Sequence, residues 1–423
     1  MKILYKRIYK EMEEIKQVRK NKRFVKELLT DRAQSNRTDP YVYQYRTLDS
    51  FWAIIQSDSF WATNARFSND QEEQSLGMKK LQEVLEENDD STLTLGDCYI
   101  VCFCDEDDKL SQWRGYAPEG VSIGFDFNNV RPFYIKKRND DKKNKDEYLQ
   151  VYNSCYKVQY ITENISRNEF AVKFDLNLSD NENNHENIRN QASDIISYVK
   201  HSGFYEEAES RLMFSDRDVD LSDCIHYRQV GNLKVPYIIV KADGGDTFKK
   251  QKCMLRLNLE ESLGKKAEKE LPKYLMRAKL KNIEVVNCRD MVRGRTDDRI
   301  CFGCSLREAY IPGINGQNPK CRYSCDKGQS FYIRSNNEIY ISNSEGQEKA
   351  YDTVMSFLRE QEKEFKDVKV WCEGHLPIRS ITVGNLRNKG IVVESIRHYC
   401  NQHYWLRCVD VKASATPFRS SLI

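Results

Sequence analysis

Residues 43–73 constrain the fold most, because this short stretch carries the periods of a strand, a helix and a second strand in succession. Tyr43 and Tyr45 alternate with polar residues, as the two faces of a strand require. Apolar residues at helical spacing follow over residues 51–55, and residues 60–63 predict the second strand. The dense mixture of aromatic and polar side chains indicates either a ligand site or a well-packed corner whose polar groups cap helices.

Composition disfavours several classes of protein. The 423 residues are 39% hydrophobic and 31% charged with a net charge of +3, which is typical of a folded chain without a polycationic field for nucleic acid or membrane. No apolar run is long enough to span a bilayer. The N-terminus is charged from its second residue and lacks the pattern of a secretory signal. We therefore expect a cytoplasmic protein that makes no membrane contact and keeps its 14 cysteines reduced.

The expected elements favour an α+β fold. Apolar or alternating runs predict strands over residues 98–104, 121–125, 156–161, 233–241, 378–383 and 405–411. Helical spacing predicts helices over residues 259–276, 346–364 and 392–400. Because strands and helices do not alternate regularly, we expect a mixed or antiparallel curved sheet of short strands with surrounding helices, not a doubly wound parallel sheet.

The distribution of charged residues predicts the domain organisation. Residues 1–35 are expected to form a charged N-terminal helix, because apolar residues recur there at helical spacing among lysines, arginines and glutamates. Residues 36–423 are expected to form a single α+β domain. Polar inserts are expected near residues 131–200 and 244–330, where charged and amide residues dominate.

Glu207, Glu209 and Arg211 are the ionisable residues whose spacing most suggests chemistry. Within a strand these three side chains would lie on one face. Adjacent carboxylates tend to raise one pKa, and a nearby arginine counteracts that rise. Such a pair suits recognition of a ribose or stabilisation of an oxocarbenium-like transition state, as in glycosidases. The alternative is a Glu–Arg ion pair that ties two strands together.

Four cysteines have a spacing that suggests a metal site. Cys301 and Cys304 form a C-x2-C pair, and Cys321 and Cys325 form a C-x3-C pair sixteen residues later. This spacing is compatible with a structural zinc ion held by four thiolates. The apolar segment beside the first pair and the looser second pair weigh against that hypothesis.

Other chemistry-bearing residues give no motif. Cys98, Cys102 and Cys104 lie in an apolar run, and we expect them to be small hydrophobic core residues. The six histidines are scattered without metal-like spacing. Neither the Rossmann nor the P-loop glycine pattern occurs, which disfavours those two nucleotide sites.

Four blocks of the sequence, taken together and in order, resemble the bacterial family of unknown function DUF2971. They are YQYRTLDSFWAIIQSDSFWATNARFSNDQEE, YIVCFCDEDDKLSQWRGYAPEGVSIGFDF, FYEEAESRLMF, and LPIRSITVG followed by SATPFRS, within residues 43–420. The departures are Gln71 and Asn385, where the family commonly has proline. The resemblance to this family implies no activity.

A looser resemblance does imply an activity. The first strand, helix and second strand, together with the late E-x-E segment, are similar to the layout of ADP-ribosyltransferases. The cofactor-binding residues that this resemblance implies are Arg46, Tyr45, Thr47, Trp113 and Tyr116. Arg46 would hold NAD, and either Tyr45 or Trp113 would stack on nicotinamide. The Ser-Thr-Ser strand of that class is missing, and Ser122 or Thr63 stands in its place.

The same resemblance assigns the two carboxylates. Glu209 would stabilise the oxocarbenium ion, and Glu207 would position an acceptor. The expected function is an NAD-consuming ADP-ribosyltransferase or NAD glycohydrolase, an effector in bacterial antiphage defence or a toxin, with NAD as substrate and a protein or nucleic acid as acceptor. The alternative is a non-catalytic sensor that binds a small nucleotide or nucleic acid through its aromatic residues and arginine.

Overall fold

The computed structural model describes residues 41–68, 72–86, 95–126, 131–138, 146–153, 155–174, 176, 178, 182–216, 220–242, 253–280, 284–287, 310–311, 320–321, 336–342, 347–363, 369–372 and 374–417. The expected N-terminal helix over residues 1–35 lies outside these ranges.

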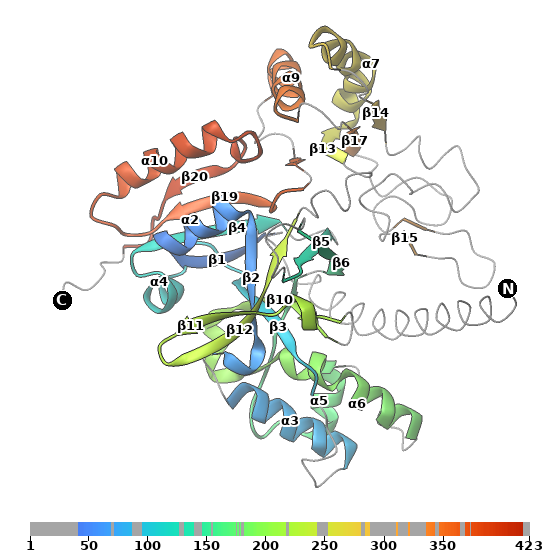
Figure 1. The fold of residues 1–423 in the computed structure, drawn as a ribbon, viewed down its shortest axis with the longest axis vertical. Coiled ribbons are helices and arrows are strands. Elements are labelled where there is room, and N and C mark those ends of the chain that lie inside the picture. The colour runs from blue at the N-terminus through green and yellow to red at the C-terminus, as the bar shows by residue number, and fades with distance from the viewer. Residues whose placement is uncertain are drawn as a thin grey trace, which may run out of the picture.

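A large, mostly antiparallel sheet forms the centre of an α+β fold (Figure 1). Its main path follows the order β20-β19-β4-β1-β3-β2-β12-β5-β6, with β10 and β7 continuing from the other edge of β3 and β11 pairing with β12. These strands are β1 (Tyr41–Thr47), β2 (Ser59–Asn64), β3 (Cys98–Cys104), β4 (Gly120–Asp126), β5 (Arg131–Lys136), β6 (Tyr148–Asn153), β7 (Cys155–Lys157), β10 (Glu209–Ser215), β11 (His226–Val230), β12 (Leu233–Lys241), β19 (Ile378–Val383) and β20 (Asp410–Ala413). Within the described part of this sheet, β19 and β20 are the one parallel pair.

The sheet divides at β3. One edge of β3 pairs with β10 along its whole length, from Glu209 opposite Cys104 to Ser215 opposite Cys98. Two strands share the other edge: β1 pairs at Cys104, and β2 pairs at Ile100 and the residue before it. Between these contacts β1 and β2 diverge, and Figure 1 shows them leaving in different directions. We call this divergence, opposite Val101–Phe103, the fork.

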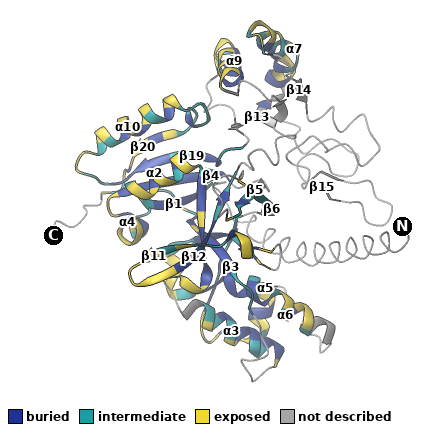
Figure 2. Ribbon diagram, in the orientation of Figure 1, coloured by how far each residue is buried: buried dark blue, intermediate teal, exposed yellow. Residues whose placement is uncertain are grey.

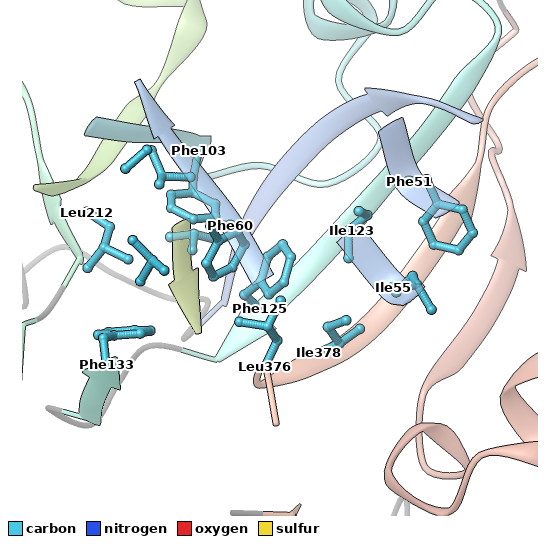
Figure 3. Packing of buried hydrophobic residues seen from close by; sticks show 14 of the residues in the cluster. Phe51, Ile55, Phe60, Phe103, Ile123, Phe125, Phe133, Leu212, Leu376 and Ile378 are labelled. Atoms are coloured by element: carbon cyan, nitrogen blue, oxygen red, sulfur yellow. The ribbon is translucent and has the colours of Figure 1, made fainter. Parts of the chain in front are cut away.

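The largest hydrophobic core lies between the two halves of the divided sheet (Figure 3). Phe60 of β2 packs edge-on against Phe103 of β3 and Phe125 of β4, with ring centroids 5.7 and 5.0 Å apart. Fully burying such a side chain contributes about 1.5–3 kcal/mol. β1 and β2, which diverge at the fork, therefore both contribute side chains to one shared core.

Helix α2 (Leu48–Ser57) connects β1 to β2 and sets the angle between them. Thr47 caps its N-terminus, because the Thr47 hydroxyl accepts a hydrogen bond from the Ser50 amide at 3.3 Å. The helix buries Phe51 in the central core and ends at Asp58, whose φ of 47° places it in the left-handed region. This short connection brings the chain back to β3 from the other side of the fork.

Further helices cover the sheet. Helices α3, α5 and α6 pack around a second core at one end of the molecule, next to the parallel pair β8–β9 (Figure 1). Helix α10 covers β19 and β20 with one buried and one exposed face, as Figure 2 shows. The bounds are α3 (Glu72–Leu85), α4 (Leu110–Tyr116), α5 (Arg167–Phe174), α6 (Glu182–Ser197), α10 (Lys389–Gln402), β8 (Gln159–Ile161) and β9 (Val199–His201).

A separate four-stranded sheet with its own core is inserted in the chain between β12 and β19. Its elements follow a β-α-β-β-α-β order and pair antiparallel as β14-β17-β13-β18. They are β13 (Cys253–Glu260), α7 (Glu261–Arg277), β14 (Glu284–Asn287), β17 (Asn336–Ser342), α9 (Gln347–Glu360) and β18 (Lys369–Cys372), and the short pair β15 (Tyr310–Ile311) and β16 (Lys320–Cys321) falls between β14 and β17. We call this unit the inserted module.

The inserted module contacts the rest of the protein through α9. Arg407, which follows the 3-10 helix η8 (Tyr404–Leu406), forms ion pairs with Glu348 at 2.9 Å and with Asp352. The Tyr351 and Tyr404 rings lie 6.2 Å apart across the same junction.

The structure confirms much of the expected element order. The strands expected over residues 98–104, 233–241 and 378–383 have those bounds. The strand expected over residues 405–411 is wrong, because η8 occupies its first two residues and β20 begins only at Asp410. Trp405 stacks on His375 there, with centroids 4.7 Å apart, which explains an apolar residue outside a strand.

Candidate functional site

Solvent reaches the central strand at Cys102, beside the fork. Cys102 is exposed, whereas the other residues of β3 are buried. The side chains around it are also buried, including Gln44 on β1 and Arg211 on β10. Cys102 pairs with Arg211 on one edge of β3 and faces the fork on the other edge, and we call this solvent-accessible position beside the fork the opening. The expectation that Cys102 is a core residue is therefore wrong, although Cys98 and Cys104 are buried.

Gln44 occupies the fork where β1 leaves β3. Its side-chain amide donates a hydrogen bond to the Cys102 carbonyl at 3.3 Å, which replaces a missing bond of the strand ladder. The Gln44 side-chain oxygen is buried and accepts no hydrogen bond from any described residue. A buried acceptor without a donor costs about 1–3 kcal/mol. The fork thus holds an unsatisfied acceptor next to an exposed strand residue.

Glu209 lies on the β10 side of the opening in a buried ion-pair network. Its carboxylate pairs with the Arg211 guanidinium at 2.7 Å and with the Lys200 ammonium at 2.7 Å. Arg211 also donates to the Ser197 carbonyl at 2.6 Å. Glu209, Arg211 and Lys200 are all at most 6% exposed. A Glu–Arg ion pair, which the sequence left as an alternative for Glu209, is therefore present, but it lies within β10 and does not tie two strands together.

The network determines the charge of Glu209. Burial alone would raise the pKa of this carboxyl group, but the charges of Arg211 and Lys200 outweigh burial and hold the pKa at about 2. The Cys102 thiol also hydrogen-bonds to Glu209. Glu209 is consequently a carboxylate at neutral pH, in contact with the residue that solvent reaches.

Glu207 approaches the same network from a different element. It ends the 3-10 helix η3 (Ser202–Glu207), and Ala208, with a φ of 44°, turns the chain into β10. The Glu207 carboxylate accepts a hydrogen bond from the Tyr116 hydroxyl at 2.7 Å and pairs with Lys200 at 2.8 Å. The expectation that Glu207 and Glu209 share one face of a strand is wrong, because only Glu209 belongs to the strand. Lys200 nevertheless brings both carboxylates together.

Arg46 lies on the opposite side of the opening, on β1. Its side chain is half-buried, and it forms no hydrogen bond or ion pair in the structure as described. Burial lowers the pKa of Arg46 from its ordinary value, the nearby Cys102 thiol opposes that shift, and the positive charge of Arg228 adds to it. Arg46 remains charged. It is therefore a guanidinium beside the fork without a protein anion to neutralise it.

Arg228 reaches the same region from the β11–β12 hairpin. Its Nη2 atom donates to the Thr63 hydroxyl on β2 at 3.0 Å, while its Nε atom is buried without an acceptor among the described residues. The guanidinium lies 6.0 Å from the ring centroids of Trp61 and Tyr237, which stack on each other at 4.6 Å. The Trp61 side chain is exposed. Arg228 could not be predicted from the sequence, because β11 reaches β2 only through its pairing with β12 in space.

Tyr45 and Trp113, which the resemblance assigns to stacking on nicotinamide, are both buried. Trp113 is 1% exposed, and its indole nitrogen donates to Asp108 at 2.8 Å. Tyr45 is buried edge-on against Trp113, donates its hydroxyl proton to the Glu106 carbonyl and accepts from the Lys109 amide. Both rings belong to a small cluster with Tyr43, Cys104 and Ala117, separate from the central core.

The remaining predicted residues have separate positions. Thr47 is an exposed helix cap, and Tyr116 is an exposed residue of α4 that contacts Glu207. Ser122 bonds to Asp107 at 3.0 Å next to Tyr45, whereas Thr63 bonds to Arg228 at the fork. Thr63 is thus the hydroxyl that adjoins the opening.

The zinc hypothesis falls mostly outside the described residues. Cys301, Cys304 and Cys325 are not described, and Cys321 is described only as part of the backbone of β16. The part of the chain that is described contains no group of His, Cys, Asp and Glu residues that could hold a metal ion. It also contains no helix with the length and apolar character needed to span a bilayer.

Comparison with known proteins supports the family resemblance over part of the chain. The model of a family described as "Protein of unknown function (DUF2971)" matches residues 112–212, from Gln112 in α4 to Leu212 in β10. The matched segment includes Glu207, Glu209 and Lys200, but Arg46 and Arg228 lie outside it. No curated protein and no solved structure matches the chain. The resemblance to ADP-ribosyltransferases gains no support from these comparisons.

Proposed function

We propose that the protein consumes NAD at the fork, as an ADP-ribosyltransferase or an NAD glycohydrolase. The observation that carries the proposal is the placement of Arg46 and Glu209 on opposite sides of one exposed residue, Cys102. A cation for the phosphates and an ionised carboxylate for the ribose are the two charges that this reaction requires. The unsatisfied oxygen of Gln44 adds an acceptor suited to an N–H group such as a carboxamide.

In the proposed reaction, the bond between nicotinamide and the ribose carbon C1′ breaks, and its electron pair leaves with nicotinamide. The resulting oxocarbenium ion is positively charged, and the carboxylate of Glu209 would stabilise it. A water molecule or an acceptor side chain then supplies an electron pair to C1′ and releases a proton. Because the pKa of Glu209 is about 2, this carboxylate keeps its charge throughout the neutral pH range.

Glu207 is the carboxylate available to the acceptor. It is less deeply buried than Glu209, and its hydrogen bond to the exposed Tyr116 links it to solvent. A carboxylate in this position can receive the proton that the acceptor releases. With water as acceptor the products are nicotinamide, ADP-ribose and a proton. With a protein or nucleic acid as acceptor, the ADP-ribosyl group is transferred.

A second candidate is a protein that binds a nucleotide without turnover. Its support is the full engagement of Glu209 by Arg211 and Lys200 together with its 5% exposure, since a substrate would have to approach a carboxylate that is already paired. Arg46 and Arg228 would then hold the nucleotide phosphates, and the protein would act as a sensor.

Nicotinamide release from NAD by the purified full-length protein distinguishes the two candidates. For the enzyme, we expect release to fall about a hundredfold in Glu209→Gln, the loss typical of removing one group that stabilises transition-state charge. Glu207→Gln is the companion variant, because it leaves the Glu209–Arg211 pair intact and should reduce transfer or hydrolysis without unfolding the protein. Circular dichroism confirms the fold of each variant. Binding of NAD without any release of nicotinamide would reject the enzyme and favour the sensor.

For an enzyme of this kind, a cellular consequence follows. Unregulated NAD consumption would deplete a bacterial host, which is how we propose that the protein acts as a toxin or in antiphage defence. Induced expression should lower cellular NAD and arrest growth, and Glu209→Gln should abolish both effects. Growth arrest that persists in this variant would contradict the proposed cause.

A further inference from the structure

Arg46 and Arg228 reach the fork from different strands, and neither has an acidic partner in the part of the chain that the structure describes. The charged neighbours that oppose most buried arginines are absent from both within the described residues, where Arg228 bonds only to the Thr63 hydroxyl and Arg46 bonds to nothing. Burying or half-burying a charge without a counter-ion is costly. A pair of such charges in one region therefore indicates a place where an external anion completes the structure.

The strand register brings the two arginines to the same level of the sheet. β1 and β2 both run antiparallel to β3, and their contacts at Cys104 and Ile100 are separated by about 13 Å of strand. Arg46 lies three residues beyond Tyr43, which advances it along β3 to the level of Val101. Thr63, to which Arg228 is bonded, lies at Ile100, one residue away along β3. Arg46 and Thr63 thus lie at neighbouring levels on the two sides of the fork, and the charge of Arg228 acts on Arg46 across it.

The aromatic pair beside Arg228 gives this region a second recognition element. Trp61 stacks on Tyr237 with an angle of 26° between the ring planes, and one face of this stack borders the Arg228 guanidinium. Trp61 is 45% exposed although it lies on a strand paired on both sides. An exposed indole beside a guanidinium offers a stacking surface for the base of a nucleotide and N–H donors for the phosphate of that nucleotide.

We propose that Arg228 and Arg46 together bind the phosphates of a nucleoside pyrophosphate, and that Trp61 stacks on its base. This inference rests on the proposed function for the identity of the ligand as the ADP-ribose part of NAD, but the binding itself requires no catalysis. It assigns specificity to Arg228, whose Nε–H group has no acceptor among the described residues and can donate to a phosphate oxygen while Nη2 bonds to Thr63. A nucleoside without phosphate would lose the contribution of both arginines.

Isothermal titration of the full-length protein with ADP-ribose, inorganic pyrophosphate and adenosine tests the inference. We expect Arg228→Gln to weaken ADP-ribose and pyrophosphate binding at least about tenfold each, the loss typical of one charge-assisted contact, and to leave adenosine binding unchanged. Trp61→Ala should weaken ADP-ribose and adenosine but not pyrophosphate. The matched control is Arg387→Gln, which removes the same charge from an exposed residue and should change nothing.

The outcomes separate this inference from the proposed catalysis. If the wild-type protein binds ADP-ribose and loses it in Arg228→Gln but releases no nicotinamide, the phosphate site stands and the enzyme is rejected. If nicotinamide is released with the same KM for NAD in wild type and Arg228→Gln, the enzyme stands and the phosphate site is overturned. Absence of ADP-ribose and pyrophosphate binding by the wild type, or an equal loss in Arg387→Gln, would also overturn it.

Discussion

Lys200 and Glu209 form an ion pair with 2.7 Å between Nζ and Oε2, although the 3-10 helix η3 separates them in the sequence. The same ammonium group pairs with Glu207 at 2.8 Å. Lys200 is therefore the residue that holds the two predicted carboxylates in one place. This relationship makes the site sensitive to a residue that lies in neither the E-x-E segment nor the first strand.

Lys200→Met should destabilise the protein. It removes a cation from between two carboxylates in a buried network, and breaking a buried pair by removing one partner costs about 3–5 kcal/mol. Urea denaturation gives the free energy of unfolding for this comparison. Lys136→Met is the matched control, because Lys136 forms an exposed pair with Asp146 whose loss should cost less than about 1 kcal/mol. Equal effects of the two substitutions would mean that Lys200 does not organise a buried network.

The ionisation of Glu209 predicts a specific dependence of stability on pH. Its pKa is about 2 in the folded protein, below the value of about 4.3 expected for an unfolded chain. The stabilisation from the carboxylate is therefore fully present above about pH 4.3 and is lost as the pH falls toward 2. The difference in free energy of unfolding between wild type and Glu209→Gln should be constant from pH 7 to 5 and should shrink below that range. A difference that stays constant down to pH 3 would contradict the lowered pKa.

Cys102 should react slowly with iodoacetamide despite its exposure. The protein packed around the thiol raises its pKa well above the ordinary value, and the negative charge of Glu209 raises it further, so little thiolate exists at pH 8. Peptide mass spectrometry should show labelling that accelerates above pH 9. If the proposed ligand occupies the fork, ADP-ribose should slow the labelling of Cys102 but not of Cys408, which lies elsewhere. Rapid labelling at pH 7 would contradict the raised pKa.

Asp108→Ala should release the segment that follows β20. The Asp108 carboxylate accepts hydrogen bonds from the Ala415 and Thr416 amides at 2.7 and 3.1 Å, from Trp113 at 2.8 Å and from the Ser414 hydroxyl. Removing the acceptor leaves these donors unpaired, at about 1 kcal/mol or more for each that is buried. Limited proteolysis should then cut near residues 414–417.

The exposed residue Asp410 on the same strand provides the control for that experiment. Asp410→Ala should leave the proteolytic pattern of the wild type unchanged. If both variants were cut at the same rate, the contacts of Asp108 would not be what holds the segment.

The pattern of apolar residues predicted a strand well where burial of its side chains alone determines the sequence. Residues 98–104 are apolar because β3 has a core on one face and packed neighbours on both edges. The exposure of Cys102 within that run could not be predicted, because it depends on where β1 and β2 separate from β3. Gln44 shows the same limit, since its bond to the Cys102 carbonyl joins strands 58 residues apart in sequence.

The candidate site was predictable in part. Glu209 and Arg211 follow strand alternation, and their pairing was one of the two interpretations that the sequence allowed. Glu207 departs from that alternation because Ala208 adopts a left-handed conformation, which neither residue type nor spacing indicates. Trp113 appeared available because an aromatic residue in a short helix can lie on either face, and the acceptor that fixes it, Asp108, is held by the distant Ser414 and Thr416.

The ends of the inserted module lie side by side. Leu255 near its start pairs with Cys372 at its end, and antiparallel partners of this kind have Cα atoms about 5 Å apart. The chain therefore leaves the main body and returns to it at nearly the same place. A whole folded unit can be inserted at such a place through two short linkers, so the pairing of the main sheet does not depend on the size of the module.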